Sequence, residues 1–433
     1  MITWFYGRHP KSEKPKKSPL DEFFGKSGIE GRADALARES NQNILDAAID
    51  KNAGAFVRFS FGTTDFEAAG LDVGLWKHVQ EADKANELED LDPKQCRYMN
   101  VEDFRTTGLR GDPKNPWPFD ENNSLAKDEQ FFAFLRAEGH STKDGNDRGS
   151  WGLGKHTFLA ASRARLMFVY TVREETPERG GNGPLVMGVN VLPETHKVDG
   201  SLFSPDGWWG DLVVDEEDGE EMVFPFGPET QYPSMIKDTF NLIREDEQTG
   251  LSVVVPFLHD ELTAEKLLQT IVRNYAIAIS DGELTVEIVA EDGQIFTLSA
   301  ENIVDTLREH NLHDELEELQ LFLWGKQNRN DAFTLAKPAL GVKPQWTQDS
   351  PPFMDETQAS AIREKIKDGN VAVRVEVPVI YAKSNKIVWS HFYCLFAPTQ
   401  SNSKPSFYRG GLKISDVRSS SPTGIRTLVI IED

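Results

Sequence analysis

Three polar residues recur at helical spacing in the stretch RESNQNILDAA, residues 38–48. Glu39, Asn43 and Asp46 stand at positions i, i+4 and i+7, so a helix would place them on one face while its apolar residues pack elsewhere. Such a face is more often simply solvated. Its carboxylate and amide groups could also bind a ligand. Other motifs in the chain are needed to choose between a solvated face and a ligand-binding face.

A second candidate is the glycine-rich stretch RGSWGLGKHT, residues 148–157. Gly149, Gly154 and Lys155 match the G-x-x-x-x-G-K spacing of a P-loop, but His156 replaces the Ser or Thr that binds magnesium there. A P-loop also follows a buried strand directly, whereas a polar stretch precedes this one. The glycines still let backbone amides approach phosphate oxygens, and a helix is predicted from His156 onward. We therefore expect a phosphate loop of another kind, with His156 facing solvent or capping the helix.

The P-loop alternative needs an acidic partner for magnesium. The stretch DLVVDEE, residues 211–217, resembles a strand that ends in such acids. It opens the longer run DEEDGEE, residues 215–221, which is more simply a solvated acidic turn. Without an acidic partner for magnesium, the glycine-rich stretch is better interpreted as a phosphate loop of another kind than as a P-loop.

Between the two stretches lies NVEDFRTTGLRG, residues 100–111, in which an aspartate at the end of a predicted strand is followed by glycines. Taken in this order, the motifs resemble those of the GHKL ATPase superfamily, which includes gyrase, a heat-shock chaperone, histidine kinases and MutL. The family's first motif, E-x-x-x-N-x-x-D-A, is matched by Glu39, Asn43, Asp46 and Ala47. The resemblance extends over about residues 31–258.

The family's other motifs follow in the expected order. Asp103 and Gly108 resemble its D-x-G-x-G motif, which is stretched here by the insertion of residues 104–107. The hinge of its lid resembles GSWGLGK, residues 149–155. Its fourth motif, normally Gly-Thr before a strand, is represented only by Thr249-Gly250.

The resemblance implies an enzyme that binds and hydrolyses ATP with Mg2+. Asn43 would offer its side-chain oxygen to magnesium, and Glu39 would orient and deprotonate the attacking water. Asp103 would accept a hydrogen bond from the exocyclic amine of adenine, which selects adenine over guanine. Lys155 is either a contact to the β- or γ-phosphate or a solvated lid lysine. The other nucleotide-binding residues that the resemblance implies are Asp46, Gly108, Gly149, Gly152, Leu153 and Gly154.

The expected fold class is α+β. A GHKL-type (Bergerat) α/β sandwich would occupy residues 31–258, and a transducer-like α+β domain would occupy residues 259–433. Residues 1–30, rich in Pro, Lys and Gly without periodicity, are expected to form an arm rather than a packed element.

The periodicity of the sequence also predicts individual elements. A helix is expected from Gly31, and a second amphipathic helix after residue 260. Residues 63–148 are expected to form a long polar insertion with few strong elements. Strands are expected at residues 53–62, within 156–173 and within 244–258.

Composition limits the environment and the partners. The net charge of −23, from 70 acidic and 47 basic residues, disfavours contact with nucleic acid or anionic membrane over most of the surface. The segment RHPKSEKPKK, residues 8–17, is a local basic exception. No apolar run is long enough to span a bilayer, and Cys96 and Cys394 indicate neither a disulfide framework nor a zinc site. We expect a cytoplasmic protein without membrane contact.

Members of the superfamily commonly pair when ATP binds, so the resemblance implies a nucleotide-dependent homodimer. A basic residue of the second domain would reach the γ-phosphate, and Lys326 and Lys343 are the candidates. Two biological functions remain possible for such an ATPase. The basic segment favours a microrchidia-like clamp on DNA, in a DNA transaction or anti-phage defence. The acidic balance favours a chaperone-like or scaffolding module in which nucleotide gates the binding of partner proteins. The final run LVIIED ends abruptly, which suggests a part of a larger protein.

Overall fold

The structure is a computed structural model that describes residues 2–18, 31–50, 53–82, 91–121, 124–137, 155–176, 179, 181–215, 219–335, 356–380, 387–400, 404–414, 417 and 423–432. The chain folds as two compact units. The first comprises residues 1–271 and 282–299, and the second comprises residues 272–281 and 300–433.

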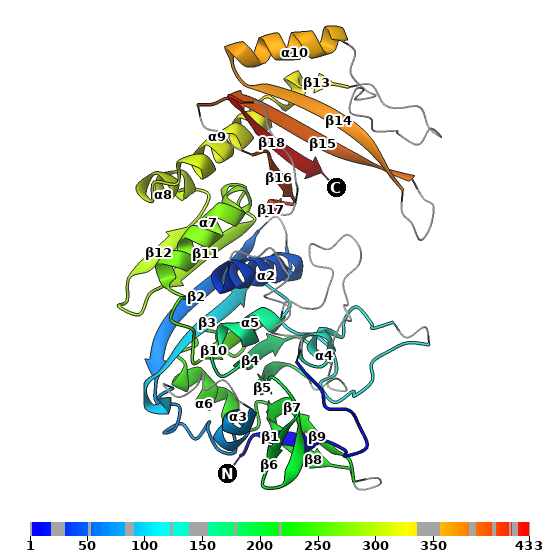
Figure 1. The fold of residues 1–433 in the computed structure, drawn as a ribbon, viewed down its shortest axis with the longest axis vertical. Helices are drawn as coiled ribbons and strands as arrows, with labels where there is room; N and C mark the ends of the chain where they lie inside the picture. The colour runs from blue at the N-terminus through cyan, green and yellow to red at the C-terminus, as the bar shows by residue number, and fades with distance from the viewer. Residues whose placement is uncertain are drawn as a thin grey trace. The chain divides into compact units, whose positions relative to one another are not determined.

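The first unit is built on a ten-stranded sheet with the order β1-β7-β5-β4-β10-β3-β2-β11-β12, and β6 pairs with β7 (Figure 1). β2 and β11 are parallel, whereas the other neighbouring strands are antiparallel. The central strands β3 and β4 are almost wholly buried because both faces of the sheet are covered. The strands are β1 (Phe5–Arg8), β2 (Ala55–Thr64), β3 (Cys96–Phe104), β4 (Leu166–Arg173), β5 (Gly183–Val191), β6 (His196–Val198), β7 (Ser201–Trp209), β10 (Gly250–Pro256), β11 (Leu284–Val289) and β12 (Ile295–Leu298).

Helices cover this sheet on its two faces. α2 (Arg32–Ala47) and α5 (Lys155–Ala161) pack against each other, α2 also contacts β2, and α5 contacts β4 and β10. The other face carries α3 (Trp76–Ala82) and α6 (Tyr232–Thr239), whose apolar residues join one hydrophobic cluster with β4. α4 (Gln130–Leu135) and a short 3-10 helix (Pro93–Gln95) complete these elements. The result is a sandwich of helices and sheet.

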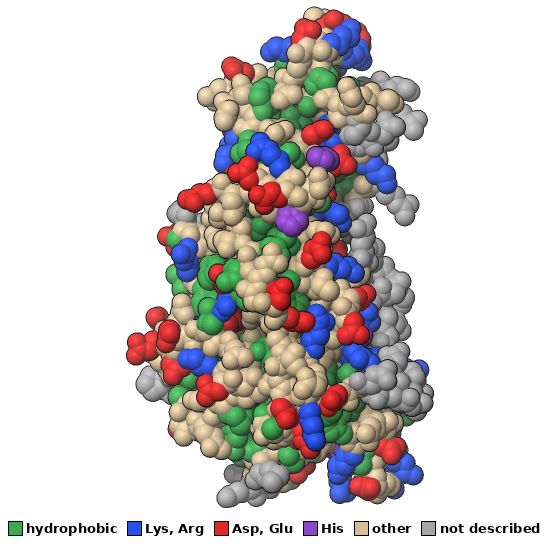
Figure 2. Space-filling view, turned by 90° about the vertical axis from the view of Figure 1, so that its left-hand side faces the viewer, with side chains coloured by type: hydrophobic (Ala, Val, Ile, Leu, Met, Phe, Trp, Pro, Cys, Tyr) green, Lys and Arg blue, Asp and Glu red, His purple; other side chains and the backbone are tan. Residues whose placement is uncertain are grey.

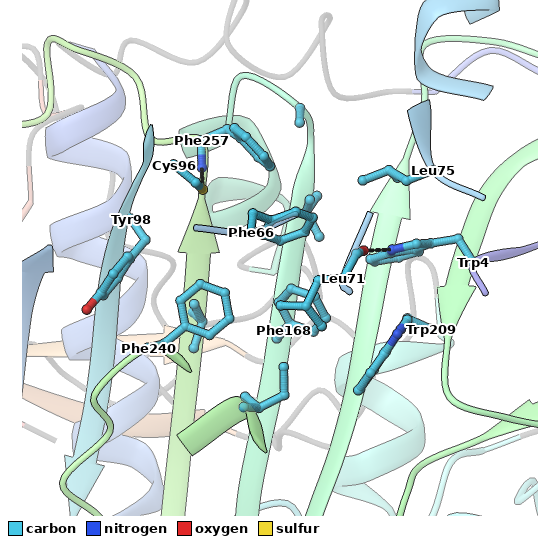
Figure 3. Packing of buried hydrophobic residues seen from close by; sticks show 14 of the residues in the cluster. Trp4, Phe66, Leu71, Leu75, Cys96, Tyr98, Phe168, Trp209, Phe240 and Phe257 are labelled. Carbon is cyan, nitrogen blue, oxygen red and sulfur yellow. Dashed lines mark hydrogen bonds between the residues drawn. The ribbon is translucent and has the colours of Figure 1, made fainter. Parts of the chain in front are cut away.

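The main core lies under α3 and α6 and is rich in aromatic rings (Figure 3). The ring of Phe168 lies 5.8 Å from that of Trp4, 5.5 Å from that of Trp209 and 5.8 Å from that of Phe240, centroid to centroid. The indole Nε1 of Trp4 donates a hydrogen bond to the carbonyl of Leu71 at 2.7 Å. This residue near the N-terminus is therefore an integral part of the core.

The prediction that residues 1–30 form an unpacked arm is wrong for residues 2–18. β1 pairs with β7, and Trp4 and Tyr6 on either side of its start are only 3% and 4% exposed. Side chains two residues apart on a strand point to the same face, so two large aromatic residues at this spacing are typical of a half-buried strand. Burying them stabilises the strand more than the following Pro and Lys residues destabilise it. Residues 19–30 lie outside the described part of the chain.

The second unit contains a six-stranded sheet with the order β13-β14-β15-β18-β16-β17. Its small core gathers Leu335, Ile362, Val371 and Val373. Its helices are the end of α7 (Ala264–Ser280), α8 (Ile303–Glu309), α9 (His313–Gln327) and α10 (Glu356–Asp368), with a short 3-10 helix (Arg329–Asp331). Its strands are β13 (Phe333–Thr334), β14 (Val371–Ile380), β15 (Ile387–Pro398), β16 (Ser406–Arg409), β17 (Leu412–Ile414) and β18 (Ile425–Glu432).

The predicted α+β class is confirmed, as are the helices α2 and α7 and the strands β2, β4 and β10. Residues 63–148 hold more regular structure than predicted, including β3 at the centre of the sheet and the helices α3 and α4. The first unit extends beyond the expected boundary near residue 259, because β11 pairs in parallel with β2 and returns residues 282–299 to the first sheet. Within the described residues, no helix has the length and apolar character to cross a membrane.

Candidate functional site

The helix α2 presents the three predicted polar residues on one face. Glu39, Asn43 and Asp46 are each partly exposed, whereas Leu36 and Ile44 are buried, with 0% and 4% of their surface exposed. The polar residues between them turn inward: Ser40 Oγ donates to the Leu36 carbonyl at 2.6 Å, and Asn41 Nδ2 donates to the Ala37 carbonyl at 2.8 Å. The face formed by Glu39, Asn43 and Asp46 is therefore the partly exposed side of α2.

The C-terminal end of α2 is tied to the segment that follows Asp103. The backbone N–H of Thr107 donates to the Ala47 carbonyl at 3.2 Å, and that of Ile49 donates to the Arg105 carbonyl at 3.0 Å. Ala48 and Thr106 form an antiparallel bridge. The fold therefore joins the end of the first predicted motif to the start of the second, although the two are far apart in sequence.

Asp103 is the penultimate residue of β3 and is 5% exposed. Its Oδ1 accepts hydrogen bonds from Thr106 Oγ1 at 2.5 Å and from the backbone N–H of Leu251 at 2.7 Å. Burial raises the pKa of Asp103, and the neighbouring Arg244 and the hydrogen bonds from Thr106 and Leu251 act against that rise. The two hydrogen bonds fix the rotation of a buried carboxylate at the end of a central strand.

Arg244 is a residue of this site that sequence reasoning missed. Its side chain is fully buried, and its Nη2 lies 3.6 Å from Asp103 Oδ1. The guanidinium also donates to Ser252 Oγ and to the backbone carbonyls of Asp103, Thr249 and Leu251. Ser252 in turn donates to Glu102 Oε2 at 2.9 Å. An arginine in the polar run REDEQTG gives no sequence signal for this role, because its partners Asp103 and Ser252 lie on strands of a sheet that forms only on folding.

Two glycines allow the strands to come close around Asp103. Gly250 has φ +144°, and a Cβ there would stand 2.2 Å from Arg244 Nη1 and 2.7 Å from Asp103 Oδ1. Gly108 has φ +66°, and a Cβ there would stand 2.3 Å from the Val172 carbonyl. The structure therefore places Gly250 beside the predicted adenine-binding aspartate and Gly108 beside Gly250. The four residues inserted before Gly108 include Thr106, which holds the Asp103 carboxylate.

Lys155 is the first residue of α5 and is 7% exposed, so the alternative that it is a solvated lid lysine is wrong. Its Nζ donates to the Ala137 carbonyl at 2.6 Å, beyond the end of α4. The other predicted residues of the lid hinge, namely Gly149, Gly152, Leu153 and Gly154, lie outside the described residues.

The expectation that His156 faces solvent or caps the helix is wrong. His156 is 3% exposed, and neither ring nitrogen has a hydrogen-bond partner within the described part of the chain. Burial, followed by the charge of Lys155, lowers the pKa of His156 to about 4. The helix α5 is buried on both sides, between α2 and the sheet, so its second residue has no route to solvent.

The described residues contain no cluster of three or more His, Cys, Asp or Glu side chains that could hold a metal ion. A magnesium ion that arrives with a nucleotide needs fewer protein ligands and prefers oxygen. The amide and carboxylate oxygens on the exposed face of α2 fit that need. Of the two candidate γ-phosphate residues, Lys326 pairs with Asp281 at 2.8 Å inside the second unit, and Lys343 lies outside the described residues.

Comparisons with known proteins find likeness only at the level of structure. No protein-family model matches the chain, and no curated protein does. Two solved structures of the ATPase region of Saccharomyces cerevisiae topoisomerase II are similar to it. The one bound to ICRF-187 (dexrazoxane) has 10% sequence identity and a TM-score of 0.34, and the other has 9% identity and a TM-score of 0.35. Each match covers 92% of this chain and 72% of the topoisomerase chain.

Proposed function

We propose that this chain is a GHKL-type ATPase that binds and hydrolyses ATP with Mg2+. One observation carries the proposal: backbone bonds between residues 47–49 and 105–107 join the C-terminal end of α2, the helix with the polar face, to the segment that follows the buried Asp103. A helix face with oxygen ligands beside a buried acceptor is the arrangement that a nucleotide needs, with its phosphates on one side and its base on the other.

Asp103 is assigned to adenine. Thr106 and Leu251 both donate to Oδ1, which leaves Oδ2 as the acceptor for the exocyclic amine. Guanine carries a carbonyl oxygen at that position, so a carboxylate repels it. Arg244 acts through Asp103 as a positioning residue, because its guanidinium holds both the carboxylate and the neighbouring backbone of β10.

The face of α2 is assigned to the phosphate end. Asn43 would hold the magnesium ion through its side-chain oxygen, and Asp46 lies on the same face. Glu39 would orient the attacking water and accept its proton. When bound, magnesium neutralises charge on the phosphates. The glycine-rich hinge, residues 149–154, would supply the remaining phosphate contacts through backbone amides. Lys155 would add an ammonium contact by exchanging its bond to the Ala137 carbonyl for one to phosphate.

Glu39 is the sharpest test of this assignment. Glu39→Gln should abolish ATP turnover and leave ATP affinity within a few-fold of wild type, because the proton acceptor is needed only for the reaction. Asp34→Asn, an acid-to-amide change in the first turn of the same helix, is the matched control and should keep turnover. Comparable turnover in the Glu39 and Asp34 variants would remove Glu39 from catalysis.

For the biological task, we propose an ATP-dependent dimer that acts as a clamp on DNA, in a DNA transaction or anti-phage defence. The exposed Lys11, Lys14 and Lys16 support DNA as the client. The net charge of −23 supports the alternative, a module in which nucleotide gates the binding of a protein partner. Duplex DNA added at low and moderate salt should raise ATP turnover if DNA is the client and leave it unchanged otherwise. Light scattering with and without a non-hydrolysable ATP analogue measures whether two chains form a dimer.

A further inference from the structure

The acidic hairpin, β8 (Asp211–Val214) with β9 (Glu221–Phe224), forms a two-stranded sheet separate from both larger sheets. All four residues of β8 are exposed, including the apolar Leu212, Val213 and Val214 at 42%, 42% and 53%. Consecutive strand residues point to opposite faces, so β8 presents apolar side chains on both. A two-stranded hairpin is marginally stable alone, and contiguous exposed apolar residues mark interaction sites.

The strand β9 anchors the acidic hairpin to the rest of the unit. Val223 is 3% exposed, and the guanidinium of Arg136 donates a hydrogen bond to its carbonyl. The same guanidinium lies over the ring of Trp208, 5.3 Å from its centroid. β8 is therefore the outer strand of the acidic hairpin, beside the small strands at one end of the first sheet (Figure 1).

The outer edge of β8 has backbone groups that point away from β9. The N–H of Asp215 donates to the Glu220 carbonyl at 2.8 Å, which makes these two a hydrogen-bonded pair. Bonded and non-bonded pairs alternate along an antiparallel ladder, so Val214 and Leu212 belong to non-bonded pairs and direct their N–H and C=O groups outward. Among the described residues, no strand other than β9 pairs with β8.

The charge of the acidic hairpin decides what can add to this edge. The segment DLVVDEEDGEE, residues 211–221, carries seven acidic residues and no basic one. If a second copy of the chain paired through the outward groups of Leu212 and Val214, Asp211 of one copy would stand opposite Asp215 of the other. Like charges directly opposite each other destabilise a strand pair. A second copy is therefore a poor occupant, and a basic strand is a good one.

We propose that the outer edge of β8 binds an extended, lysine- or arginine-rich segment of a partner protein by β-strand addition. The partner's backbone completes the ladder at Leu212 and Val214. Its apolar side chains cover the exposed apolar residues of β8, and its basic side chains meet the carboxylates of Asp211, Asp215, Glu220 and Glu221. This surface uses none of the residues assigned to the nucleotide.

Peptide binding to the full chain tests the proposal. The probe is a capped KVKVKVK peptide, titrated by calorimetry or fluorescence anisotropy at low salt, and its affinity should fall as salt is raised. EVEVEVE, with reversed charge, and KVKPKVK, in which proline removes a ladder donor, are the matched controls and should bind at least about tenfold more weakly. Equal binding of EVEVEVE overturns the charge argument, and equal binding of KVKPKVK overturns strand addition.

Two protein variants separate the backbone contribution from the charge contribution. Val214→Pro removes an outward N–H without removing a bond to β9, and should weaken KVKVKVK binding about tenfold or more, whereas Val213→Thr should not. The double variant Glu220→Gln, Glu221→Gln should lower the affinity for KVKVKVK and reduce its salt dependence. If Val214→Pro does not fold, as judged by circular dichroism, the double variant alone tests the proposal. Unchanged affinity in the folded variants overturns the proposal, as does a dimer of the wild-type chain that Val214→Pro abolishes.

Discussion

Replacing Asp103 by asparagine probes the base-binding part of the proposed ATP site with little change of shape. The amide oxygen of asparagine can still accept the hydrogen bonds from Thr106 and Leu251 that now go to Oδ1. The other oxygen becomes an NH2 group, which donates where the carboxylate accepts. The variant therefore places a donor against the exocyclic amine of adenine, and the same donor suits the carbonyl oxygen of guanine.

The expected size of the effect follows from the bond that is lost. A hydrogen bond to a charged acceptor is worth about 1.5–3 kcal/mol, and about 1.4 kcal/mol corresponds to a tenfold change in Kd. Asp103→Asn should therefore weaken ATP binding about 10- to 100-fold and lower the preference for ATP over GTP. Folding stability should not suffer comparably, because burial raises the pKa of Asp103 and so opposes folding of the ionised form above the ordinary aspartate pKa. Glu102 remains near Arg244 in the variant.

Isothermal titration with ATP and with GTP, both with magnesium, measures the two affinities. Asp246→Asn is the matched control, since Asp246 is nearby but exposed and pairs with Lys237 at the surface. A thermal melt by circular dichroism establishes that each variant is folded. If folded Asp103→Asn binds ATP as wild type does, with the same ratio of ATP to GTP affinity, Asp103 does not contact the base.

Three further predictions concern stability. Arg244→Met should cost about 3–5 kcal/mol in urea unfolding, because it removes the buried cation that interacts with the buried carboxylates of Asp103 and Glu102; a loss below about 1 kcal/mol would contradict the role given to this arginine. Gly250→Ala should destabilise far more than Gly7→Ala, since a Cβ at 250 meets Arg244 Nη1 at 2.2 Å and a Cβ at 7 meets nothing within 4 Å; equal melting temperatures would refute this. Burial lowers the pKa of His78 from 6.5 to about 4. As the pH falls from about 6.5 to about 4, His78 is therefore protonated in the unfolded chain but not in the folded one, and the free energy of unfolding falls by about 3 kcal/mol. In His78→Phe the fall measured by urea unfolding should be smaller, and an unchanged pH dependence would rule His78 out as its source.

The sequence by itself determined the elements whose residues follow a single period. The spacing of Leu36 and Ile44 predicts α2 and places Glu39, Asn43 and Asp46 on its accessible face, because a helix repeats every 3.6 residues whatever packs against it. The alternation in residues 53–62 predicts β2 for the same reason. Gly108 and Gly250 were named from the sequence only through the family resemblance, and the structure shows the close backbone approach at each.

The tertiary structure alone decided which of these elements meet. Arg244 donates to the carbonyl of Leu251, seven residues away, and to that of Asp103, 141 residues away. No local sequence pattern encodes the distant partner. His156 is buried because α2 and the sheet enclose α5, although its neighbours in sequence are polar. Trp4 joins the core although Pro and Lys residues follow it, because the apolar surface that it buries lies on strands far along the chain. Periodicity acts between near neighbours, whereas burial and ion pairing depend on residues that only the folded chain brings together.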